Sequence, residues 1–457
     1  MAIASVNPST GLLLRAFESH TGVFVEEALG RAARSAAEWR RVPLSRRAAL
    51  LTAVAIRLDT ERETLARLAT LEMGKTLRSA RDEVAKCAFG CRYYAAEGEL
   101  MLATERITAA DFSGRIRYEP LGVILAVMPW NFPFWQVFRA AVPALMAGNA
   151  MVLKHASNVP QCALAIEQLF REAGAPEGLF QTLLIPASGV AALIADPRIA
   201  AVTVTGSEAA GRDIASHAGR VTKKCVLELG GSDPFIVLAD ADIERAAQTA
   251  VTARMLNNGQ SCVCAKRFIV DHRVADAFEA AFVSRVRALK VGDPADDTTD
   301  IGPLATEQGA RDIASQVDRT ITSGATLLVG GSRAQRDGWF YEPTVLSNVP
   351  LDSAAATEET FGPAAPIFRV SGVDEALVLA NATPLGLGSS VWTRDASVAE
   401  HCVSSLDVGM VFINALVASD PRIPFGGVKG SGYGREVGVH GLREFVNVKT
   451  VRGSVAP

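Results

Sequence analysis

Residues 123–133 read VILAVMPWNFP, an apolar run that stops at a turn bounded by two prolines. A helical pattern follows over residues 134–147. Further apolar runs then alternate with helical patterns, at residues 151–153, 180–185, 201–205 and 226–227. Strands without polar alternation, separated by helices, are typical of a parallel sheet covered on both faces. Functional sites in such sheets lie at the carboxyl ends of the strands, so the turn after residue 128 is a candidate site.

The same alternation resumes after residue 233 and indicates a second α/β unit. Its predicted strands are residues 235–238, 268–270, 389–392 and 409–414, and its predicted helices are residues 242–256, 274–289, 307–323 and 396–405. Three helices are predicted before the first sheet, over residues 26–39, 45–73 and 79–102. Residues 290–305 are rich in Gly, Pro and Asp and predict a surface loop. Residues 105–119 and 443–452 predict extended arms that pair with each other or with another subunit.

Composition excludes several classes of protein. The 457 residues are 49% hydrophobic and 21% charged, which is ordinary for a globular enzyme of two or three domains. The formal net charge of −3 provides no basic surface for nucleic acid, and no apolar run is long enough to span a membrane. Seven cysteines at scattered spacings argue against a disulfide framework, and the N-terminal residues lack the layout of a signal peptide. We therefore expect a cytoplasmic protein that binds neither nucleic acid nor membranes.

Cys262 ends the stretch NNGQSC, residues 257–262, and so lies in a polar turn loosened by glycine. A free cysteine titrates near about 8.5, and its thiolate is the reactive form. Three other stretches accompany it: PWNFP at residues 129–133, LELGG at residues 227–231 and EETFGP at residues 358–363. Together they offer a nucleophile, an amide donor and a carboxylate base. The alternative for Cys262 alone is a small buried thiol, which describes most cysteines.

In this order and at these separations, the motifs resemble the NAD(P)-dependent aldehyde dehydrogenase superfamily over essentially the whole chain. Three further stretches are similar to bacterial succinate-semialdehyde dehydrogenases: KHASNVP at residues 154–160, FGGVK at residues 425–429 and GYGRE at residues 432–436. The resemblance implies an α/β, aldehyde dehydrogenase-like fold with a doubly wound Rossmann-type cofactor domain, an α/β catalytic domain and a small β oligomerisation element. We assign residues 1–106 and 121–229 to the cofactor domain, 230–430 to the catalytic domain, and 107–120 and 431–457 to the oligomerisation element, in a homodimer or tetramer.

Three residues match the catalytic groups of the family. Cys262 would add to an aldehyde carbon and carry the acyl group as a thioester. Asn131 would donate its side-chain amide to the oxyanion, beside the backbone N–H of Cys262. Glu228, poorly solvated at the end of a strand, would activate the water that hydrolyses the thioester. Acylating relatives that use coenzyme A lack a base here, which favours hydrolysis to a free acid. The alternatives are a helix-capping asparagine at Asn131 and a structural ion pair at Glu228.

The cofactor residues also follow from the resemblance, since no Gly-x-Gly-x-x-Gly follows a strand. Gly206 and Ser207 stand where a strand end opens a helix, and their backbone would hold the pyrophosphate. Glu359 resembles the carboxylate that holds the nicotinamide ribose, and Trp130 and Phe361 are the aromatic residues of the cofactor pocket. The six histidines show no metal-binding spacing, and the chemistry needs no metal.

Lys154 and Ser157 predict the choice between the two cofactors. Family members that demand NAD commonly carry an acid where Ser157 stands, and that acid would repel a 2′-phosphate. Ser157 donates a hydrogen bond instead and Lys154 adds positive charge, so we expect NADP to be preferred and NAD tolerated. The alternative is that Ser157 caps a helix.

The substrate prediction centres on Arg139, which follows Trp135 by one helical turn and shares its face. A guanidinium in an apolar tunnel would bind the remote carboxylate of a semialdehyde, with Ser419 as a second contact. Some succinate-semialdehyde dehydrogenases carry another arginine shortly before the nucleophile, where this chain has Leu256, with Arg254 nearby. Succinate semialdehyde is therefore the expected substrate, and the alternative is a dehydrogenase for glutarate semialdehyde or for a broad range of aliphatic aldehydes. A simple salt bridge is the alternative for Arg139.

Cys264 forms a Cys-x-Cys pair with the nucleophile, as in certain succinate-semialdehyde dehydrogenases, which suggests a redox switch. A disulfide between such close cysteines would be strained and easily reduced. The alternative is a small residue that fills space behind Cys262. A protein that has kept the fold and lost the activity is a rival from another class. It is disfavoured because Cys262, Glu228 and Asn131 are all present.

Overall fold

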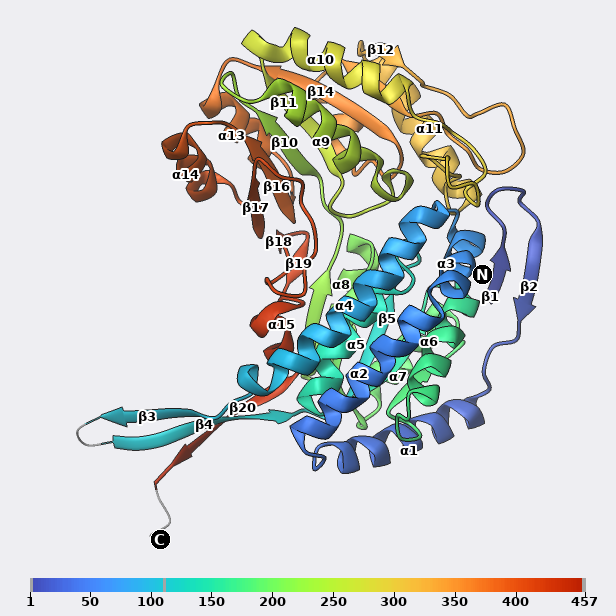
Figure 1. The fold of residues 1–457 in the computed structure, drawn as a ribbon, viewed down its shortest axis with the longest axis vertical. Helices are drawn as coiled ribbons and strands as arrows, with labels where there is room; N and C mark the ends of the chain where they lie inside the picture. The colour runs from blue at the N-terminus through green and yellow to red at the C-terminus, as the bar shows by residue number, and fades with distance from the viewer. Residues whose placement is uncertain (1–2, 110–111, 454–457) are drawn as a thin grey trace.

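The computed structural model describes residues 3–109 and 112–453 and contains two large sheets, one above the other in Figure 1. The lower sheet has six strands in the order β19-β9-β8-β5-β6-β7. These strands are β5 (Val123–Met128), β6 (Ala150–His155), β7 (Phe180–Thr182), β8 (Ile199–Thr205), β9 (Lys224–Glu228) and β19 (Gly432–Tyr433). All of its pairings are parallel except that between β19 and β9. The parallel sheet predicted from the apolar runs is therefore confirmed.

Helices cover both faces of this sheet (Figure 1). The connecting helices are α5 (Trp135–Ala147), α6 (Pro160–Glu172), the 3₁₀ turn η1 (Ala187–Gly189) with α7 (Val190–Ala195), and α8 (Glu208–Arg220). The N-terminal helices are α1 (Gly22–Trp39), α2 (Leu44–Thr60), α3 (Arg62–Met73) and α4 (Leu77–Met101). The single helix predicted over residues 45–73 is thus wrong, because the chain breaks at Glu61. α3 ends at Gly74, whose φ of 80° is left-handed and suits glycine.

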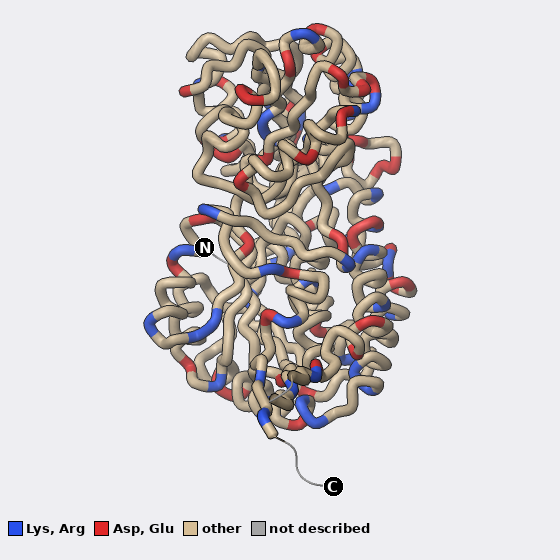
Figure 2. Tube along the Cα trace, turned by 90° about the vertical axis from the view of Figure 1, so that its left-hand side faces the viewer, with Lys and Arg blue, Asp and Glu red and all other residues tan. Residues whose placement is uncertain are grey.

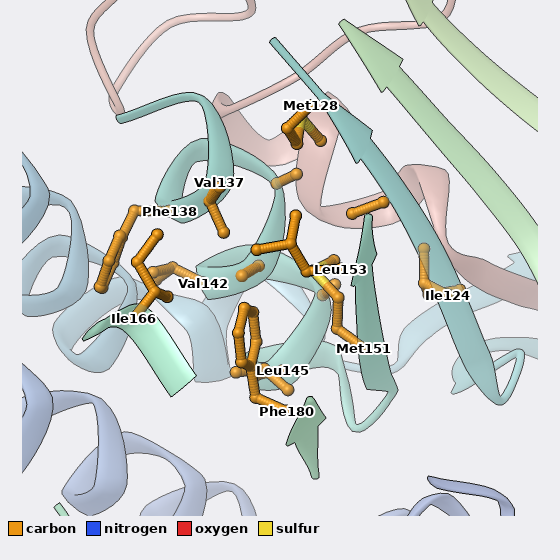
Figure 3. Packing of buried hydrophobic residues seen from close by; sticks show 14 of the residues in the cluster. Ile124, Met128, Val137, Phe138, Val142, Leu145, Met151, Leu153, Ile166 and Phe180 are labelled. Carbon is orange, nitrogen blue, oxygen red and sulfur yellow. The ribbon is translucent and has the colours of Figure 1, made fainter. Parts of the chain in front are cut away.

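The core of the lower unit lies between α5 and the sheet. Every residue of α5 is buried, and β5 and β6 are apolar on both faces, as strands covered by helices must be. Figure 3 shows Val142 and Leu145 of α5 packed beside Leu153 and Phe180 of the sheet. Because this core fixes α5 against β5, it also fixes the turn between them, residues 129–134, which is the first candidate site.

The upper sheet has seven strands in the order β12-β13-β14-β11-β10-β16-β17. They are β10 (Asp233–Val237), β11 (Ala265–Asp271), β12 (Thr326–Val329), β13 (Thr344–Ser347), β14 (Ala364–Val370), β16 (Gly388–Trp392) and β17 (Met410–Ile413). Its helices are α9 (Ile243–Met255), α10 (His272–Arg287), α11 (Glu307–Thr322), α12 (Ala354–Thr357), α13 (Val373–Asn381) and α14 (Ala396–Ser405). Strands β12, β13 and β14 were not predicted. β14 was missed because it contains Pro366, which lacks an N–H and is unusual inside a strand.

Three smaller elements complete the fold. β3 (Glu105–Ala109), β4 (Phe112–Pro120) and β20 (Val446–Arg452) form a sheet that projects from the body at the lower left of Figure 1. β20 pairs with β4 antiparallel, so the two arms do pair with each other. β1 (Ile3–Val6) and β2 (Leu13–Phe17) form a hairpin, β15 (Leu385–Gly386) pairs with β18 (Val428–Lys429), and α15 (Gly438–Glu444) precedes β20. The three-domain division stays an interpretation.

Charge is mixed over the molecule. Lysine and arginine alternate with aspartate and glutamate along the trace in Figure 2. Within residues 3–109 and 112–453, none of the helices is both long and apolar enough to cross a bilayer.

Candidate active site

Cys262 lies in a loop whose backbone is fixed by polar side chains. The loop leaves α9 through the 3₁₀ turn η2 (Leu256–Gly259) and enters β11. Asn257 and Asn258 have left-handed φ values of 56° and 59°, which asparagine tolerates better than most residues. The Asn258 amide donates to the carbonyl oxygens of Gly74 at 3.1 Å and Pro303 at 2.9 Å. These bonds hold the cysteine loop against the α3–α4 turn and the end of the 290–305 segment.

Cys262 lies where two cavities meet. The larger, of about 480 Å³, is bordered by α4, α5, the cysteine loop and residues 416–419. The smaller, of about 300 Å³, is bordered by the turn after β5, the β8–α8 turn, and Glu359 with Phe361. Cys262 and Gln136 border both. A thiol at this position can reach one molecule in each cavity.

Cys262 is half-buried in the structure. Burial raises the pKa of Cys262 to about 12, and the nearby charges of Arg139 and then Lys266 offset part of that rise. The raised pKa disfavours the thiolate, which is the reactive form. Its conversion to a thiolate requires a proton acceptor close by.

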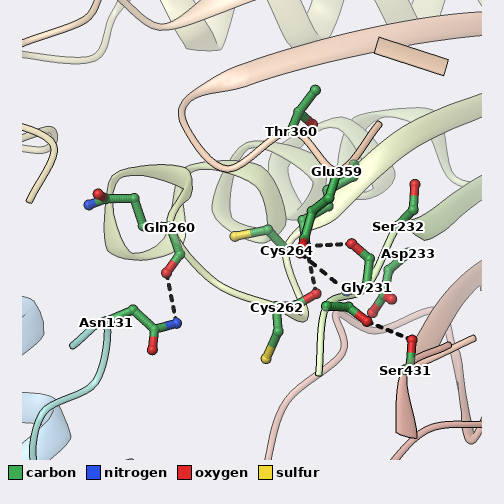
Figure 4. Close-up of polar contacts among 12 residues, drawn as sticks. Asn131, Gly231, Ser232, Asp233, Gln260, Cys262, Cys264, Glu359, Thr360 and Ser431 are labelled. Atoms are coloured by element: carbon green, nitrogen blue, oxygen red, sulfur yellow. Dashed lines mark hydrogen bonds and ion pairs between the residues drawn. The ribbon is translucent and has the colours of Figure 1, made fainter. Parts of the chain in front are cut away.

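Asn131 brings its amide to the cysteine loop. It follows β5 in the turn before α5, and its Nδ2 donates to the carbonyl oxygen of Gln260 at 3.1 Å. In return the amide of Asn257 donates to the carbonyl oxygen of Asn131 at 2.7 Å. Figure 4 shows the Asn131 amide on the same side of the loop as the Cys262 sulfur. The position suits an amide donor to an oxyanion formed at Cys262, and that role stays a prediction.

Glu228, the last residue of β9, is 2% exposed. Neither carboxylate oxygen has a hydrogen-bond partner among the described residues. Burial, and then the charge of Glu436, raise the pKa of Glu228 well above its usual value. A Cβ at Gly426 would lie only 2.6 Å from Oε1, so the backbone closes tightly around this carboxyl group. A buried carboxyl group with no partner and a raised pKa has the properties of a general base.

Arg139 lies on the wall of the larger cavity, but its charge is already matched. Its Nε pairs with the buried carboxylate of Glu436, and its Nη2 donates to Thr205 at 3.3 Å. Its guanidinium also stacks over Phe425, at 4.4 Å from the ring centre. The salt bridge considered as an alternative is thus present, although it lies inside the protein. Binding of a carboxylate by Arg139 stays a prediction.

The remaining residues proposed for the substrate fall where expected. Trp135 and Ser419 border the larger cavity, and so does Leu256. Arg254 does not border the larger cavity. It is fully buried, and its guanidinium donates to backbone carbonyl oxygens, including that of Ala364 at 2.6 Å. Arg254 therefore stabilises the loop before β14 and offers no charge to the cavity.

Lys266 is a residue of the site that the sequence analysis missed. Its ammonium group donates to the carbonyl oxygens of Gly231 at 2.7 Å and Cys262 at 2.8 Å, and to Glu359 Oε1 at 2.6 Å. One buried cation thus joins the strand end after Glu228, the cysteine loop and the carboxylate of Glu359. The available signal was the pair of basic residues, Lys266 and Arg267, directly before the apolar run of residues 268–270.

The smaller cavity is bordered by residues that the sequence analysis predicted to bind the cofactor. Trp130 and Phe361 meet edge to face across it, with ring centres 5.8 Å apart. Gly206 and Ser207 form its rim, and a Cβ added at Gly206 would meet no atom within 4 Å, so the turn is open to a ligand. Glu359 Oε1 accepts the N–H of Gly231 at 3.1 Å, which fixes this carboxylate at the cavity.

Lys154 and Ser157 lie outside this cavity, at the end of the neighbouring strand. Lys154 pairs in register with Val127 of β5, and burial lowers its pKa. Ser157 does not cap a helix, because α6 begins at Pro160 after Val159. Lys154 is buried and Ser157 is half-buried, so contact of either with a 2′-phosphate stays a prediction.

Cys264 is buried behind the cysteine loop. Its sulfur lies 3.5 Å from the carbonyl oxygen of Leu256, and burial raises its pKa. In Figure 4 the thiols of Cys262 and Cys264 point in different directions. A disulfide between them would require one side chain to turn, so the redox switch stays a prediction. Within the described part of the chain, no cluster of side chains could hold a metal ion.

Comparison with known proteins gives one consistent result. The model of the aldehyde dehydrogenase family matches residues 1–451. The chain is 52% identical to succinate-semialdehyde dehydrogenase [NADP(+)] 1 of Mycobacterium tuberculosis and 51% identical to succinate-semialdehyde dehydrogenase [NADP(+)] of Mycobacterium leprae, in each case over 99% of both chains. The crystal structure of succinic semialdehyde dehydrogenase from Streptococcus pyogenes in complex with NADP+ is 37% identical, with a TM-score of 0.96 over 98% of this chain and 99% of that one.

Proposed function

Since the chain belongs to the aldehyde dehydrogenase family, we propose that it oxidises succinate semialdehyde to succinate, with NADP preferred and NAD tolerated. The observation that carries the proposal is the position of Cys262 where the two cavities meet. The larger cavity would hold the aldehyde and the smaller the nicotinamide. The relatives from Mycobacterium tuberculosis and Streptococcus pyogenes, whose names specify this substrate and NADP, support the choice.

The proposed reaction begins at the sulfur of Cys262. As a thiolate it adds to the aldehyde carbon, forming a C–S bond and placing negative charge on the former carbonyl oxygen. The Asn131 amide and the backbone N–H of Cys262 would donate to that oxygen. The hydride on this carbon would leave to the nicotinamide, which supplies the two-electron acceptor when it is bound. The carbon is then a thioester attached to Cys262.

Glu228 would complete the cycle. Its carboxylate removes a proton from water, the resulting hydroxide adds to the thioester carbon, and the C–S bond breaks to release the acid and the thiolate. The raised pKa of Glu228 makes its carboxylate a stronger proton acceptor than an ordinary glutamate. The alternative role for Glu228 is acceptance of the proton of Cys262, whose own pKa is raised by burial.

Five residues are the proposed contacts of the nicotinamide half of the cofactor. Trp130, Phe361 and Glu359 surround the smaller cavity, and Gly206 with Ser207 lie at the amino end of α8, where backbone N–H groups favour a phosphate. Lys154 and Ser157 are the proposed contacts of the adenosine 2′-phosphate. In support, neither side chain makes a hydrogen bond within the described part of the chain.

Replacing Ser157 with glutamate tests the cofactor assignment. A carboxylate at this position would repel the 2′-phosphate of NADP and accept bonds from the ribose hydroxyls of NAD. We expect the NADP:NAD ratio of kcat/KM to fall by roughly 10²-fold, the size expected for one close repulsive pair in a partly screened site. Ser157→Ala is the matched control and should change the ratio far less. An unchanged ratio in Ser157→Glu would contradict the assignment.

The proposed contacts of the substrate carboxylate are Arg139, Trp135 and Ser419. Each borders the larger cavity, and Oγ of Ser419 has no hydrogen-bond partner among the described residues. The Nη1 group of Arg139 makes no hydrogen bond in that part of the chain either, so a second acceptor can approach it.

A substrate panel tests the proposed function. The parent enzyme, assayed with NADP, should show a kcat/KM for succinate semialdehyde about 10²-fold above that for uncharged butanal, as expected for charge-assisted hydrogen bonds to the carboxylate. Glutarate semialdehyde belongs in the same panel, because one extra methylene changes kcat/KM by about 10-fold or more in a fitted pocket. Equal kcat/KM values for succinate semialdehyde and butanal would favour a dehydrogenase for a broad range of aliphatic aldehydes. A higher kcat/KM for glutarate semialdehyde would favour a glutarate-semialdehyde dehydrogenase.

We also propose a homodimer or tetramer in the cytoplasm. The three-stranded sheet of β3, β4 and β20 supports the assembly, because it projects from the body and is largely exposed (Figure 1). The free state of all seven cysteines supports a reducing compartment.

A further inference from the structure

The larger cavity contains a cation that differs from its neighbours. Arg78 on the same wall pairs with Asp300 at 3.0 Å, and Arg139 pairs with Glu436. Lys86 of α4 also borders the cavity, but no carboxylate lies within 4 Å of its ammonium group in the described part of the chain. Its positive charge is therefore the unbalanced one in this cavity.

Aromatic packing holds Lys86 in place. Its Nζ lies 4.6 Å from the centre of the Trp135 ring, within the range of a cation–π contact. Gly90, one helical turn further along α4, supports the same ring, because a Cβ there would lie 3.3 Å from Trp135. The indole of Trp135 is thus fixed between α4 and the cavity, and the ammonium group stands over it.

Two unpaired hydrogen-bond donors belong to residues that border the same cavity as Lys86. The Nε1 of Trp135 and the Oγ of Ser419 are both buried, both belong to walls of the larger cavity, and neither has a partner among the described residues. Unpartnered buried donors are costly, so a group that accepts from them binds favourably. A carboxylate accepts hydrogen bonds and balances an ammonium charge at the same time.

The other charged residues around Lys86 do not neutralise its ammonium group. Glu83 on the same helix is bound to Lys75, and Asp420 is bound to Arg422. Asp82, one turn before Lys86, also borders the cavity, but it is exposed, so water screens its repulsion. Burial, and then the charge of Arg139, lower the pKa of Lys86 to about 8, so most of the ammonium form persists at neutral pH.

We propose that Lys86 determines the preference for a charged substrate, by pairing with the remote carboxylate of the semialdehyde while Trp135 and Ser419 donate to it. The inference rests on the proposed function, since it concerns the same substrate. The two cations differ in what they offer the carboxylate. Arg139 already pairs with Glu436 and can add only its Nη1 donor, whereas the charge of Lys86 has no carboxylate partner among the described residues.

The test compares Lys86→Met, which removes the charge and keeps the length, with Lys86→Arg, which keeps the charge. In Lys86→Met, kcat/KM for succinate semialdehyde should fall by about 10–10²-fold, mainly through KM, while kcat/KM for butanal stays within about twofold of the parent. Lys86→Arg should retain most of the preference. Succinate, added as an inhibitor, should bind more weakly to Lys86→Met by a similar factor. The parent's preference should decline as pH rises past about 8, and that of Lys86→Arg should not.

Arg78→Met is the matched control, since it removes a paired cation from the same helix and the same cavity. It should leave the preference unchanged. The inference is overturned if Lys86→Met keeps the parent's preference, or if Arg78→Met loses it equally. Failure of the proposed function has a different outcome, in which the parent itself shows no preference for the semialdehyde. Unchanged turnover of butanal shows that each variant is folded.

Discussion

Replacing Cys262 with serine is expected to lower kcat by about 10⁴-fold or more, because loss of a covalent nucleophile removes the whole reaction path. A serine hydroxyl in the same place is far harder to ionise than a thiol. Among the described residues, Gln136 is the other one that borders both cavities, and its amide cannot replace the thiol as a nucleophile. The measurement is NADPH formation with succinate semialdehyde at saturating NADP.

Cys264→Ser is the matched control for this variant. It removes a buried thiol two positions away, whose sulfur lies 3.5 Å from a backbone carbonyl oxygen and borders neither cavity. It should keep most of the parent's activity in the absence of oxidants. If Cys264→Ser lost activity and Cys262→Ser kept it, the nucleophile would be Cys264 and the assignment of Cys262 would be wrong.

Replacing Glu228 with glutamine should slow steady-state turnover by about 10²–10⁴-fold, the usual contribution of a general base. The amide has nearly the same shape but cannot accept the proton of the attacking water. The thioester should therefore accumulate, and a burst of NADPH equal to the enzyme concentration should precede a very slow steady state. Absence of a burst would mean that Glu228 acts before the thioester, on the proton of Cys262.

The pH dependence of the parent follows from the same carboxyl group. Burial and the charge of Glu436 raise the pKa of Glu228, and only the ionised form can act as a base. Turnover should thus increase as pH rises through this raised pKa, and it should be lower at pH values below the pKa. In Glu228→Gln that increase should disappear.

Much of this site follows from local sequence and the rules of parallel sheets. Asn131 follows β5 and Glu228 ends β9, and both strands were recognisable as apolar runs between helices. The carboxyl ends of parallel strands share one edge of a sheet, so these two residues lie at the same edge although they are distant along the chain. Cys262 was recognisable because a glycine-containing polar turn is an unusual place for a structural cysteine.

What could not be predicted depends on contacts between distant segments. Arg139 was expected to offer its charge to a ligand, but Glu436 of the C-terminal part pairs with it. Lys266 joins three segments, and its partners become clear only when the two sheets are placed together. The pKa of Cys262 is a similar case, since burial raises it, whereas a free cysteine titrates near about 8.5.

The central claim is that the acyl group is carried on the sulfur of Cys262, and its most direct test is mass spectrometry of Glu228→Gln. The variant is mixed with succinate semialdehyde and NADP, quenched in acid and digested. The account predicts that the peptide containing Cys262 gains the mass of one succinyl group, and that hydroxylamine removes it, as expected of a thioester. An unmodified Cys262 peptide after a full burst of NADPH, or a succinyl group on any other residue, would contradict the account.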